Sequence, residues 1–466
     1  MIRSTLRGNS PSVLVAALSS AFGVCLLHST NALGTMIRGD DVTGSSDTAA
    51  FFLSVVALVF IAVAVFVGSI VTVNTFATII AGRTRTIALM RLIGSSARQQ
   101  RRQVAKEGLT VGIIGSALGA IIGTALAVTG IAVSTAAGAI PALDYRYFEL
   151  NLILPIVAVA LTTWLASWIG SRRVLDVSPI HATGAAEEMT HEQSRSRRGR
   201  NTVAITLFAL GMLILLAGTA IGMVSPLGVL VGVVGGFLSF TGVVLGAHLV
   251  MPYTLRVVGR AFGRSAPGKL AAENAVRYPE RSSRTTIGLV IGVTLVTMFA
   301  VAIESFQVFI AEAQKADPLY YTGIDEMMVI TITVLSVLTG FSALIAALGL
   351  VNTLSLSVMQ RTRELGLLRA LGFTARQVRQ MILVESAQLT VAAVLVGLVL
   401  GTVYGWAGAQ ATFGSIQGSP GIIVPAVPFA LLAGVVVAAA VLTWAASVAP
   451  SRRATRIAPV EALAVQ

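Results

Sequence analysis

The segment RTRELGLLRALG at residues 361–372 repeats an earlier segment, RTRTIALMRLIG, at residues 83–94. The two copies stand 278 residues apart, and an Ala-Arg-Gln triplet follows each of them at the same spacing. Apolar membrane segments resemble one another through composition alone, but a polar segment repeats its residues only under some constraint. We therefore interpret the chain as an internal duplication. We name residues 83–99 the first repeat loop and residues 361–377 the second repeat loop.

The rest of the chain is strongly apolar. Of its 466 residues, 55% are hydrophobic and 11% are charged, whereas a soluble domain has about 25% charged residues. This composition excludes a soluble enzyme, and it excludes a disordered chain, which needs low hydrophobicity. The single cysteine, Cys25, excludes a disulfide framework and a thiolate metal site, and four scattered histidines argue against a His-rich metal centre. The chain is predicted to be a membrane protein.

Membrane-spanning helices need about 20 mostly apolar residues each, and the chain contains ten segments of this kind. The fold class expected from them is an all-α polytopic membrane protein. The predicted spans are 13–36, 50–80, 108–138, 150–170, 202–223, 227–251, 286–311, 327–358, 383–409 and 424–449.

The distribution of positive charge supports this count. With ten crossings, both termini and the four longer basic loops lie on one side, which receives 30 of the 33 Lys and Arg residues. The other side receives only Arg38, Arg146 and Lys315. Because cytoplasmic loops carry the excess of Lys and Arg, both termini are predicted to be cytoplasmic. The protein is expected in the plasma membrane of a bacterium.

A second repeat follows the last helix of each half, where Ser-Arg-Arg at 171–173 returns at 451–453. Each half is therefore predicted to be a four-helix unit, and both units have the same orientation, unlike the inverted repeats of many transporters. The predicted organisation is a first unit at 1–185, a basic linker at 186–200, a central transmembrane pair at 201–255, a linker with an amphipathic segment at 256–285, and a second unit at 286–466.

Each repeat loop is predicted to form a short amphipathic helix and the start of a second helix that leads into the membrane. In the second loop, three leucines at three-residue spacing from Leu365 to Leu371 share one helix face. Gly372, like the glycine at the same position of the first loop, suits a helix C-terminus. The next helix is predicted to start at Ala375 and to enter the membrane near Glu385. Basic anchoring in the headgroup layer is one interpretation, but it leaves the repeated glycine and triplet unexplained, so we favour a docking surface.

The loops resemble the coupling region of the FtsX-like permease family of ABC transporters, whose unit is four transmembrane helices. The motif of that family reads Arg-x-Arg-Glu-x-Gly-x-Leu-Arg-Ala-x-Gly, then a Gln, then a Glu that opens the third helix. The second copy matches it at Arg361, Arg363, Glu364, Gly366, Leu368, Arg369, Ala370, Gly372, Gln377 and Glu385. The first copy keeps Arg83, Arg85, Arg91, Gly94, Gln99 and Glu107, but it has Thr86, Ala88 and Leu92 where the motif has Glu, Gly and Ala. The ten-helix arrangement is similar to that of bacitracin-resistance permeases.

The resemblance implies a non-enzymatic permease subunit that is operated by two copies of a separate cytoplasmic ATPase. ATP and Mg would be bound in those partners, and this chain is expected to bind no cofactor and no metal. The matched loop residues are then ATPase-coupling residues, and Glu107 and Glu385 lie at the stalk. The implied function is export or extraction of an amphiphilic substrate, such as an antimicrobial peptide, a lipid or a drug. Membrane lipids are expected partners, and a sensor kinase or an accessory membrane protein is a further candidate.

Two alternatives remain open from the sequence. The first is a regulatory complex that uses ATPase turnover to signal to a sensor kinase or a cell-wall hydrolase. Relatives that act on outer partners carry large outer domains, whereas this chain has only 12 residues at 38–49 and 15 at 312–326 in those places. The second is an ion-coupled secondary transporter, which needs acids within the membrane. Only Glu304 qualifies, and it is either a helix-packing group or a substrate contact in an outer vestibule.

Other motifs give no sign of separate chemistry. Gly263–Lys269 resembles a phosphate loop but lacks the Ser or Thr that would hold magnesium. His28 and His248 are expected to be helix-packing groups, and the glycines of residues 112–119 and of Gly235-Gly236 are expected to form packing seams. Because the basic loops contain almost no aromatic residues, nucleic-acid binding is not expected.

Overall fold

The computed structural model describes residues 10–39, 84–138, 140–147, 150–172, 198–262, 266–277, 279–316, 367–415 and 421–456, and parts of 55–80 and 339–347. All regular elements among these residues are helices, as predicted. Seven of the helices are long and apolar enough to cross a membrane: Ser12–Met36, Ala97–Ala136, Ile153–Gly170, Arg198–Gly222, Gly228–Leu245, Thr285–Lys315 and Ala375–Phe413. Two shorter apolar helices, Ile61–Val73 and Phe429–Ala445, fall in two further predicted spans. The tenth predicted span, 327–358, lies almost wholly outside the described residues.

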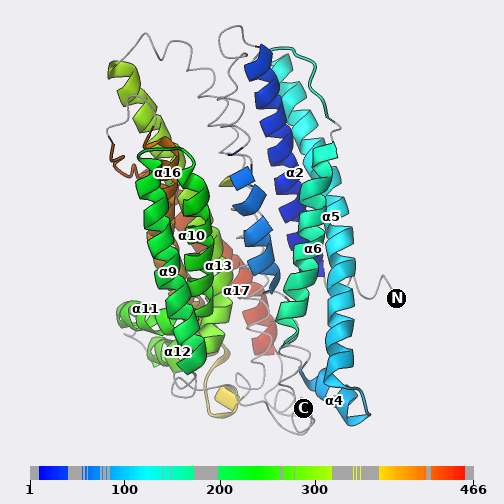
Figure 1. Cartoon of the computed structure of the whole chain (residues 1–466). Coiled ribbons are helices and arrows are strands. Elements are labelled where there is room, and N and C mark those ends of the chain that lie inside the picture. The colour runs from blue at the N-terminus through cyan, green and yellow to red at the C-terminus, as the bar shows by residue number, and fades with distance from the viewer. Residues whose placement is uncertain are drawn as a thin grey trace. The chain divides into compact units, whose positions relative to one another are not determined.

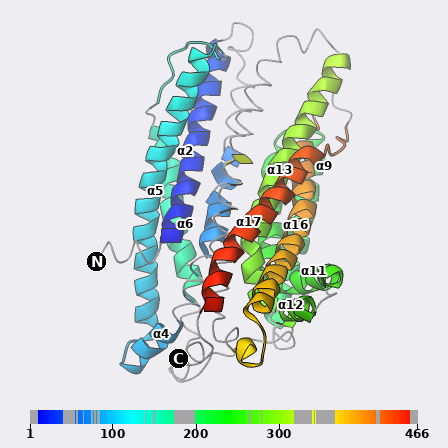
Figure 2. The same cartoon turned by 180° about the vertical axis from the view of Figure 1, so that it is seen from behind.

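The chain divides into two compact units. In the described residues, unit 1 contains α2 (Ser10–Gly39), α4 (Thr84–Leu92), α5 (Ala97–Ala136), η1 (Leu150–Leu152) and α6 (Ile153–Gly170) (Figure 1). Unit 2 contains α9 (Arg198–Gly222), α10 (Gly228–Leu245), α11 (Ala247–Phe262), α12 (Ala266–Arg277), α13 (Pro279–Ala316), α16 (Ala375–Phe413) and α17 (Phe429–Arg456) (Figure 2). The predicted domain boundaries remain predictions, and most of the linker at 186–200 lies outside the described residues.

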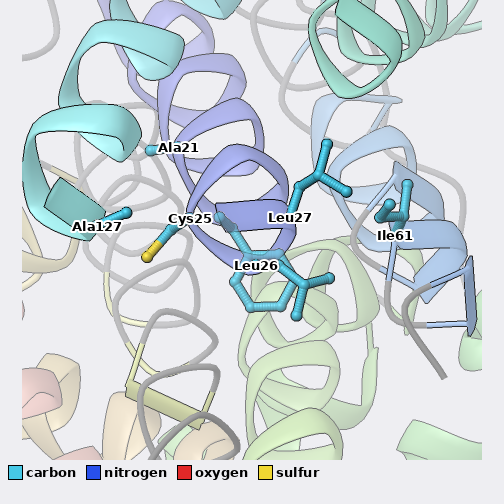
Figure 3. Close-up of a cluster of buried hydrophobic side chains, with 7 residues drawn as sticks. Ala21, Cys25, Leu26, Leu27, Ile61 and Ala127 are labelled. Carbon is cyan, nitrogen blue, oxygen red and sulfur yellow. The ribbon is translucent and has the colours of Figure 1, made fainter. Parts of the chain in front are cut away.

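Unit 1 is held together by close contacts between α2 and α5. A side chain added at Gly115 or Gly123 of α5 would meet Ala16 or Ala21 of α2 at 2.6 Å, so only glycine allows this approach. The contacts ascend together along both helices, and the helices therefore run parallel. Further along, Cys25 of α2 lies beside Ala127 of α5 in a buried apolar cluster (Figure 3).

Unit 2 repeats this arrangement between α13 and α16. Gly397 of α16 faces Val293 at 2.7 Å from an added Cβ, and Gly401 faces Thr297 at 2.5 Å. Gly397 and Gly401 stand 278 residues after Gly119 and Gly123, the same offset as the repeat loops. The first and third helices of each four-helix repeat, α2 with α5 and α13 with α16, therefore pack in parallel through glycines at equivalent positions. The equivalent glycine positions agree with the predicted internal duplication; the same orientation of the two copies remains a prediction.

The third and fourth helices of the two four-helix repeats, α5 with α6 and α16 with α17, also make contacts at equivalent positions. Gly112 of α5 packs on Thr163 of α6, at 3.2 Å from an added Cβ. At the corresponding place in unit 2, the hydroxyls of Thr390 on α16 and Thr443 on α17 share a buried hydrogen bond of 2.7 Å. A hydroxyl pair in one unit thus replaces a glycine contact in the other.

The central helices α9 and α10 form a glycine-lined hairpin that packs against α16. Gly235 contributes to the hairpin as predicted, because an added Cβ there would meet the backbone of α9, whereas an added Cβ at Gly236 would meet nothing within 4 Å. The predicted span at 227–251 ends earlier, since α10 stops at Leu245 and α11 begins at Ala247. The intervening Gly246 is the C-cap of α10, with φ −88° and ψ 5°.

Both histidines in the predicted spans have polar partners. His28 Nε2 of α2 is 3.4 Å from Thr124 Oγ1 of α5, and His248 Nε2 of α11 is 2.8 Å from Asn201 Oδ1 of α9. They serve as the predicted helix-packing groups. Among the described residues, no three His, Cys, Asp or Glu side chains gather in a way that could hold a metal ion.

Candidate functional site

The two repeat loops end their first helix in the same backbone turn. In the first loop the Ser95 N–H donates to the Met90 carbonyl at 2.9 Å, and the Gly94 N–H donates to the Arg91 carbonyl at 3.2 Å. In the second loop Phe373 donates to Leu368 at 3.0 Å and Gly372 donates to Arg369 at 3.1 Å. Both pairs form a Schellman motif, which satisfies the last carbonyls of a helix. It requires a left-handed residue, and the φ angles of Gly94 and Gly372 are 101° and 99°.

The helix that follows each turn is capped in a related way. The Gln99 N–H donates to Ser96 Oγ at 3.2 Å at the start of α5, and the Gln377 N–H donates to Thr374 Oγ1 at 3.2 Å at the start of α16. In α16 the Gln377 side chain also accepts from the Thr374 N–H at 2.9 Å, which completes a capping box. The predicted start of the second helix at Ala375 is therefore confirmed.

Apolar side chains protrude from both turns at equivalent positions. Ile93 and Leu371 stand 278 residues apart and are 80% and 72% exposed, and Leu89 and Leu367 are exposed one turn earlier. Exposed basic residues, Arg98 and Arg376, follow in the next helix. Each loop thus presents an apolar tip beside a positive charge. Large exposed apolar groups rimmed by polar residues are typical of a protein-binding surface.

The loops differ in what supports them from behind. In the first loop, Ile87 and Ala88 of α4 are buried against Ile80 and Val104. In the second loop, Leu368 and Phe373 pack on a buried cluster that includes Ala271 of α12 and Met381 of α16. The second loop therefore rests on an additional helix, α12, which is part of unit 2.

Close to the first loop, the guanidinium group of Arg101 lies over the ring of Trp168, with its Cζ 4.0 Å from the ring centroid. Arg101 also donates to the Trp168 carbonyl at 3.3 Å, and Arg172 lies 5.9 Å from the same ring. This cation–π contact joins the start of α5 to the end of α6. In the second copy, Arg379 corresponds to Arg101, but Val448 stands at the equivalent of Trp168.

The structure describes part of the predicted coupling set. Arg91, Gly94 and Gln99 lie in or beside the first turn, and Leu368, Arg369, Gly372 and Gln377 lie in or beside the second. Arg85 belongs to the first turn of α4, but its side chain lies outside the described part. Arg83, Arg361, Arg363, Glu364 and Gly366 lie outside the described residues. The predicted contact of all these residues with an ATPase remains a prediction.

The two stalk acids lie in the helices that leave the turns. Glu107 of α5 is half-buried and Glu385 of α16 is buried. They are equivalent in the repeat, and each lies ten residues into its helix, about 15 Å from the helix start at 1.5 Å per residue. The structure thus brings them near the loops without placing them at the exposed tips.

Glu304 belongs to a different region, close to the far end of unit 2. Beside it, Ser305 Oγ of α13 accepts from the Ala426 N–H at 3.2 Å. Gln410 donates to the Gly421 carbonyl at 2.8 Å and accepts from the Ile423 N–H at 2.7 Å. These bonds hold the segment 421–428 across the ends of α13 and α16. Glu304 is half-buried and has no hydrogen bond or ion pair within the described part of the chain.

Sequence reasoning missed the support that α12 gives to the second loop. A signal for it exists, because Ala271 and Ala275 recur at four-residue spacing and both are fully buried. It also missed Thr374 and Ser96, although Thr and Ser three residues before Gln are typical of a helix N-terminus.

Both repeat loops lie in parts of the chain that resemble known proteins. Residues 58–179 and 336–459, more than half of the chain, match the family model described as the FtsX-like permease C-terminal domain. Each match contains one repeat loop. An uncharacterized ABC transporter permease, YknZ of Bacillus subtilis, is 32% identical over 165 residues, which are 34% of this chain and 36% of that protein.

Two further relatives match shorter stretches. The macrolide export ATP-binding/permease protein MacB of Nitrobacter winogradskyi is 33% identical over 130 residues, 28% of this chain and 19% of MacB. An uncharacterized ABC transporter permease of Methanocaldococcus jannaschii, MJ1507, is 32% identical over 98 residues, 21% of this chain and 23% of that protein. The matched part of this chain therefore spans at most 36% of the length of these three relatives.

Proposed function

The chain belongs to the FtsX-like permease family, and on that premise we propose that it is the permease subunit of an ABC transporter whose two repeat loops bind ATPase subunits. The observation that carries this proposal is that the two turns have the same backbone structure. Both loops build the same Schellman motif and expose apolar residues at the same two positions. A duplicated rigid tip suits a partner that is present in two copies.

The chemistry of the tips supports a protein partner with an apolar groove. Ile93 and Leu371 are large and exposed, and the turn fixes their backbone, so the loop itself need not become ordered when they are buried in a partner. A few anchors of this kind carry most of the energy of an interface. The neighbouring Arg98 and Arg376 favour acidic residues at the rim of the groove. Each loop would therefore insert its exposed apolar side chain, Ile93 or Leu371, into the groove of one ATPase subunit.

Two loops of this kind predict two ATPase subunits for each permease chain. The first loop lacks the motif's Glu and Gly but keeps the turn and the exposed pair, and we propose that it binds through these shared features. ATP-driven movement of the ATPases would then act on α5 and α16, because each helix starts three residues after its turn glycine.

The test is co-purification of the full chain with its co-expressed ATPase. Ile93→Asp and Leu371→Asp change one exposed side chain each. Val424→Asp is the matched control, since Val424 is equally exposed and lies in the segment 421–428, at the opposite end of α16 from the second loop. We expect two ATPases per wild-type or control chain, one for each single variant and none for the double variant. Retention of both ATPases by the double variant, or none by wild type, would overturn the proposal.

We further propose that the substrate is an amphiphile, such as a peptide antibiotic, a lipid or a drug. The relative MacB is named for macrolide export, and macrolides are amphiphilic. The chain offers an apolar interior with Glu304 half-buried near its far end. In reconstituted vesicles, amphiphiles should stimulate ATP hydrolysis and small hydrophilic solutes should not. Stimulation by hydrophilic solutes alone would contradict this assignment.

A further inference from the structure

Helix α11 departs from the direction of the other helices of unit 2. A single residue, Gly246, separates it from the end of α10. Figures 1 and 2 show α11 and α12 lying across the axis of α9, α10, α13 and α16, at the end of unit 2 where α16 begins. Because α10 is long and apolar enough to cross a membrane, α11 emerges directly at the membrane surface.

The surface of α11 is divided into three faces. The buried face carries Ala247, Met251, Leu255 and Val258, all at most 6% exposed, and it packs on α12, α13 and α16. At about 100° per residue, the exposed remainder separates into two edges. One edge is apolar and carries Val250, Tyr253 and Val257, which are 42%, 71% and 54% exposed. The other edge is basic and carries the exposed Arg256 and Arg260.

The order of these edges around the helix fits a membrane surface. Gly259, on the side next to the basic edge, packs against Ala272 of α12, at 3.2 Å from an added Cβ. The basic edge therefore adjoins α12, and the apolar edge lies on the opposite border of the exposed sector. In Figure 1, α12 lies farther than α11 from the middle of the unit. The apolar edge thus faces toward the level of the spanning helices, and the basic edge faces away from it.

The charge of α11 and α12 indicates which kind of lipid this surface would bind. The described residues of α11 and α12 contain four basic side chains, Arg256, Arg260, Lys269 and Arg277, and one acidic side chain, Glu273. A helix with an apolar edge, a tyrosine at the border and arginines beyond it is typical of interfacial helices, in which basic residues attract anionic headgroups.

From these faces we infer that α11 lies in the headgroup layer of the membrane, that it binds anionic phospholipid, and that it supports the second repeat loop through α12. The link to the loop runs through packed side chains. Gly259 of α11 contacts α12, and Ala271 of α12 belongs to the cluster on which Leu368 and Phe373 pack. Among the described residues, the first loop packs on Ile80 and Val104 instead. Anionic lipid therefore acts on the second loop and not on the first.

The depth of α11 can be measured in the full chain, because its only cysteine, Cys25, is buried and can be replaced. In a Cys25→Ala background, spin labels at Tyr253→Cys and Val257→Cys report the apolar edge, and a label at Glu273→Cys is a water-exposed reference. In vesicles of phosphatidylglycerol and phosphatidylcholine, the two α11 labels should be accessible to oxygen and protected from a water-soluble nickel complex. Equal nickel accessibility at all three sites would overturn the inference. This measurement needs no ATPase.

The lipid charge is tested with Arg260→Gln and with Arg146→Gln as the control, since both arginines are exposed and Arg146 lies in the segment between α5 and α6. Loss of one basic residue near an anionic surface should weaken phosphatidylglycerol binding about fivefold, as measured by native mass spectrometry. An unchanged affinity in Arg260→Gln would contradict the lipid assignment.

The link to the second loop rests on the proposed function. In an Ile93→Asp background, where only the second loop binds, phosphatidylglycerol should strengthen ATPase binding, and Arg260→Gln should raise the lipid concentration that this gain requires about fivefold. In a Leu371→Asp background the lipid should have no effect. An equal lipid effect in both backgrounds would overturn the link. If neither background bound ATPase while the depth pattern held, the proposed function would fail and the lipid assignment would stand.

Discussion

Tyr404 of α16 and Ser239 of α10 share a buried hydrogen bond of 2.9 Å between their hydroxyl oxygens, although they stand 165 residues apart in the chain. The rings of Phe240 and Tyr404 meet in a T-shaped arrangement, with the centroids 6.2 Å apart. Near the far end of the hairpin, Gly222 of α9 lies against the backbone of Ala411. The central helices α9 and α10 therefore pack on α16, the third helix of the second repeat, and α10 is hydrogen-bonded to it.

Weakening this attachment should cost stability in proportion to the contact that is lost. Tyr404→Phe removes one hydrogen bond between helices, and we expect a loss of about 0.6 kcal/mol. Gly222→Leu should cost more, since an added Cβ would meet the Ala411 carbonyl at 2.7 Å. Thermal unfolding in detergent measures both changes. Gly236→Ala is the control, because its Cβ would meet nothing within 4 Å. A Gly222→Leu chain that unfolds like wild type would contradict this packing.

The turn glycines should be sensitive to conformation alone. An added Cβ at Gly94 or Gly372 would meet nothing within 4 Å, so Gly94→Ala and Gly372→Ala introduce strain only through the positive φ. We expect a loss of about 1–2 kcal/mol from each turn, and weaker ATPase binding at that loop. Asn should recover part of the loss, because it tolerates the left-handed region better than Ala.

A matched control for the turns is Gly130→Ala in α5, where the Cβ also has open space but the backbone is helical. There, alanine should stabilise the helix, since it has the higher helix propensity. Equal effects of Gly94→Ala and Gly130→Ala on unfolding temperature would show that the turn does not need glycine.

The glycine contacts between the first and third helices should be equivalent in the two units. Gly123→Ala places a Cβ 2.6 Å from the Ala21 carbonyl, and Gly401→Ala places one 2.5 Å from Thr297 Cβ. Overpacking of this kind costs about 1–3 kcal/mol. Both variants should therefore lower the unfolding temperature, and Gly408→Ala, with an unobstructed Cβ, should not. An effect in one unit alone would argue against equivalent packing.

Gln410 should control the order of the segment 421–428. Gln410→Leu removes the side-chain hydrogen bonds to the Gly421 carbonyl and to the Ile423 N–H. Ile423 is buried, and a buried N–H that loses its partner costs about 1–3 kcal/mol. The Ile423 amide should then exchange with deuterium much faster than in wild type. Trp406→Phe, which removes only the bond to the Ile423 carbonyl, should have a smaller effect. Unchanged exchange in Gln410→Leu would refute this role.

The contact between Arg101 and Trp168 should stabilise the base of the first loop only. Trp168→Leu removes a cation–π interaction worth about 0.5–1 kcal/mol at an exposed site. Trp164→Leu is its control, because Trp164 lies one turn earlier on α6 with a similar exposure. We expect Trp168→Leu to weaken ATPase binding at the first loop, measured in the Leu371→Asp background. A similar loss from Trp164→Leu would assign the effect to general packing.

The elements that could be predicted from the sequence depend on local patterns. The helical fold class, the glycine turns at Gly94 and Gly372 and the start of α16 at Ala375 all follow from short-range rules of apolar length and capping. The equivalence of Gly119 with Gly397 was also within reach, since the offset of the repeat loops predicts it.

Other features depend on contacts between distant segments. Ser239 and Thr443 are ordinary polar residues in apolar runs, and nothing near them in the chain identifies Tyr404 or Thr390 as the partner. The docking of α12 under the second loop likewise depends on which helix α16 meets at that end. The break at Gly246 was missed because the first residues of α11, 247–251, are mostly apolar and continue the apolar run of α10.

The glycine contacts of α5 and α16 have a mechanical consequence. Each helix is an unbroken rod, 40 or 39 residues long, and therefore about 60 Å in length. Gly119 and Gly397 lie 22 residues from the respective helix starts, a little beyond the midpoint. Each rod therefore extends by a similar length on either side of this glycine contact. We expect a sideways push at a turn to be passed along the rod to its opposite end without any change in the helix itself.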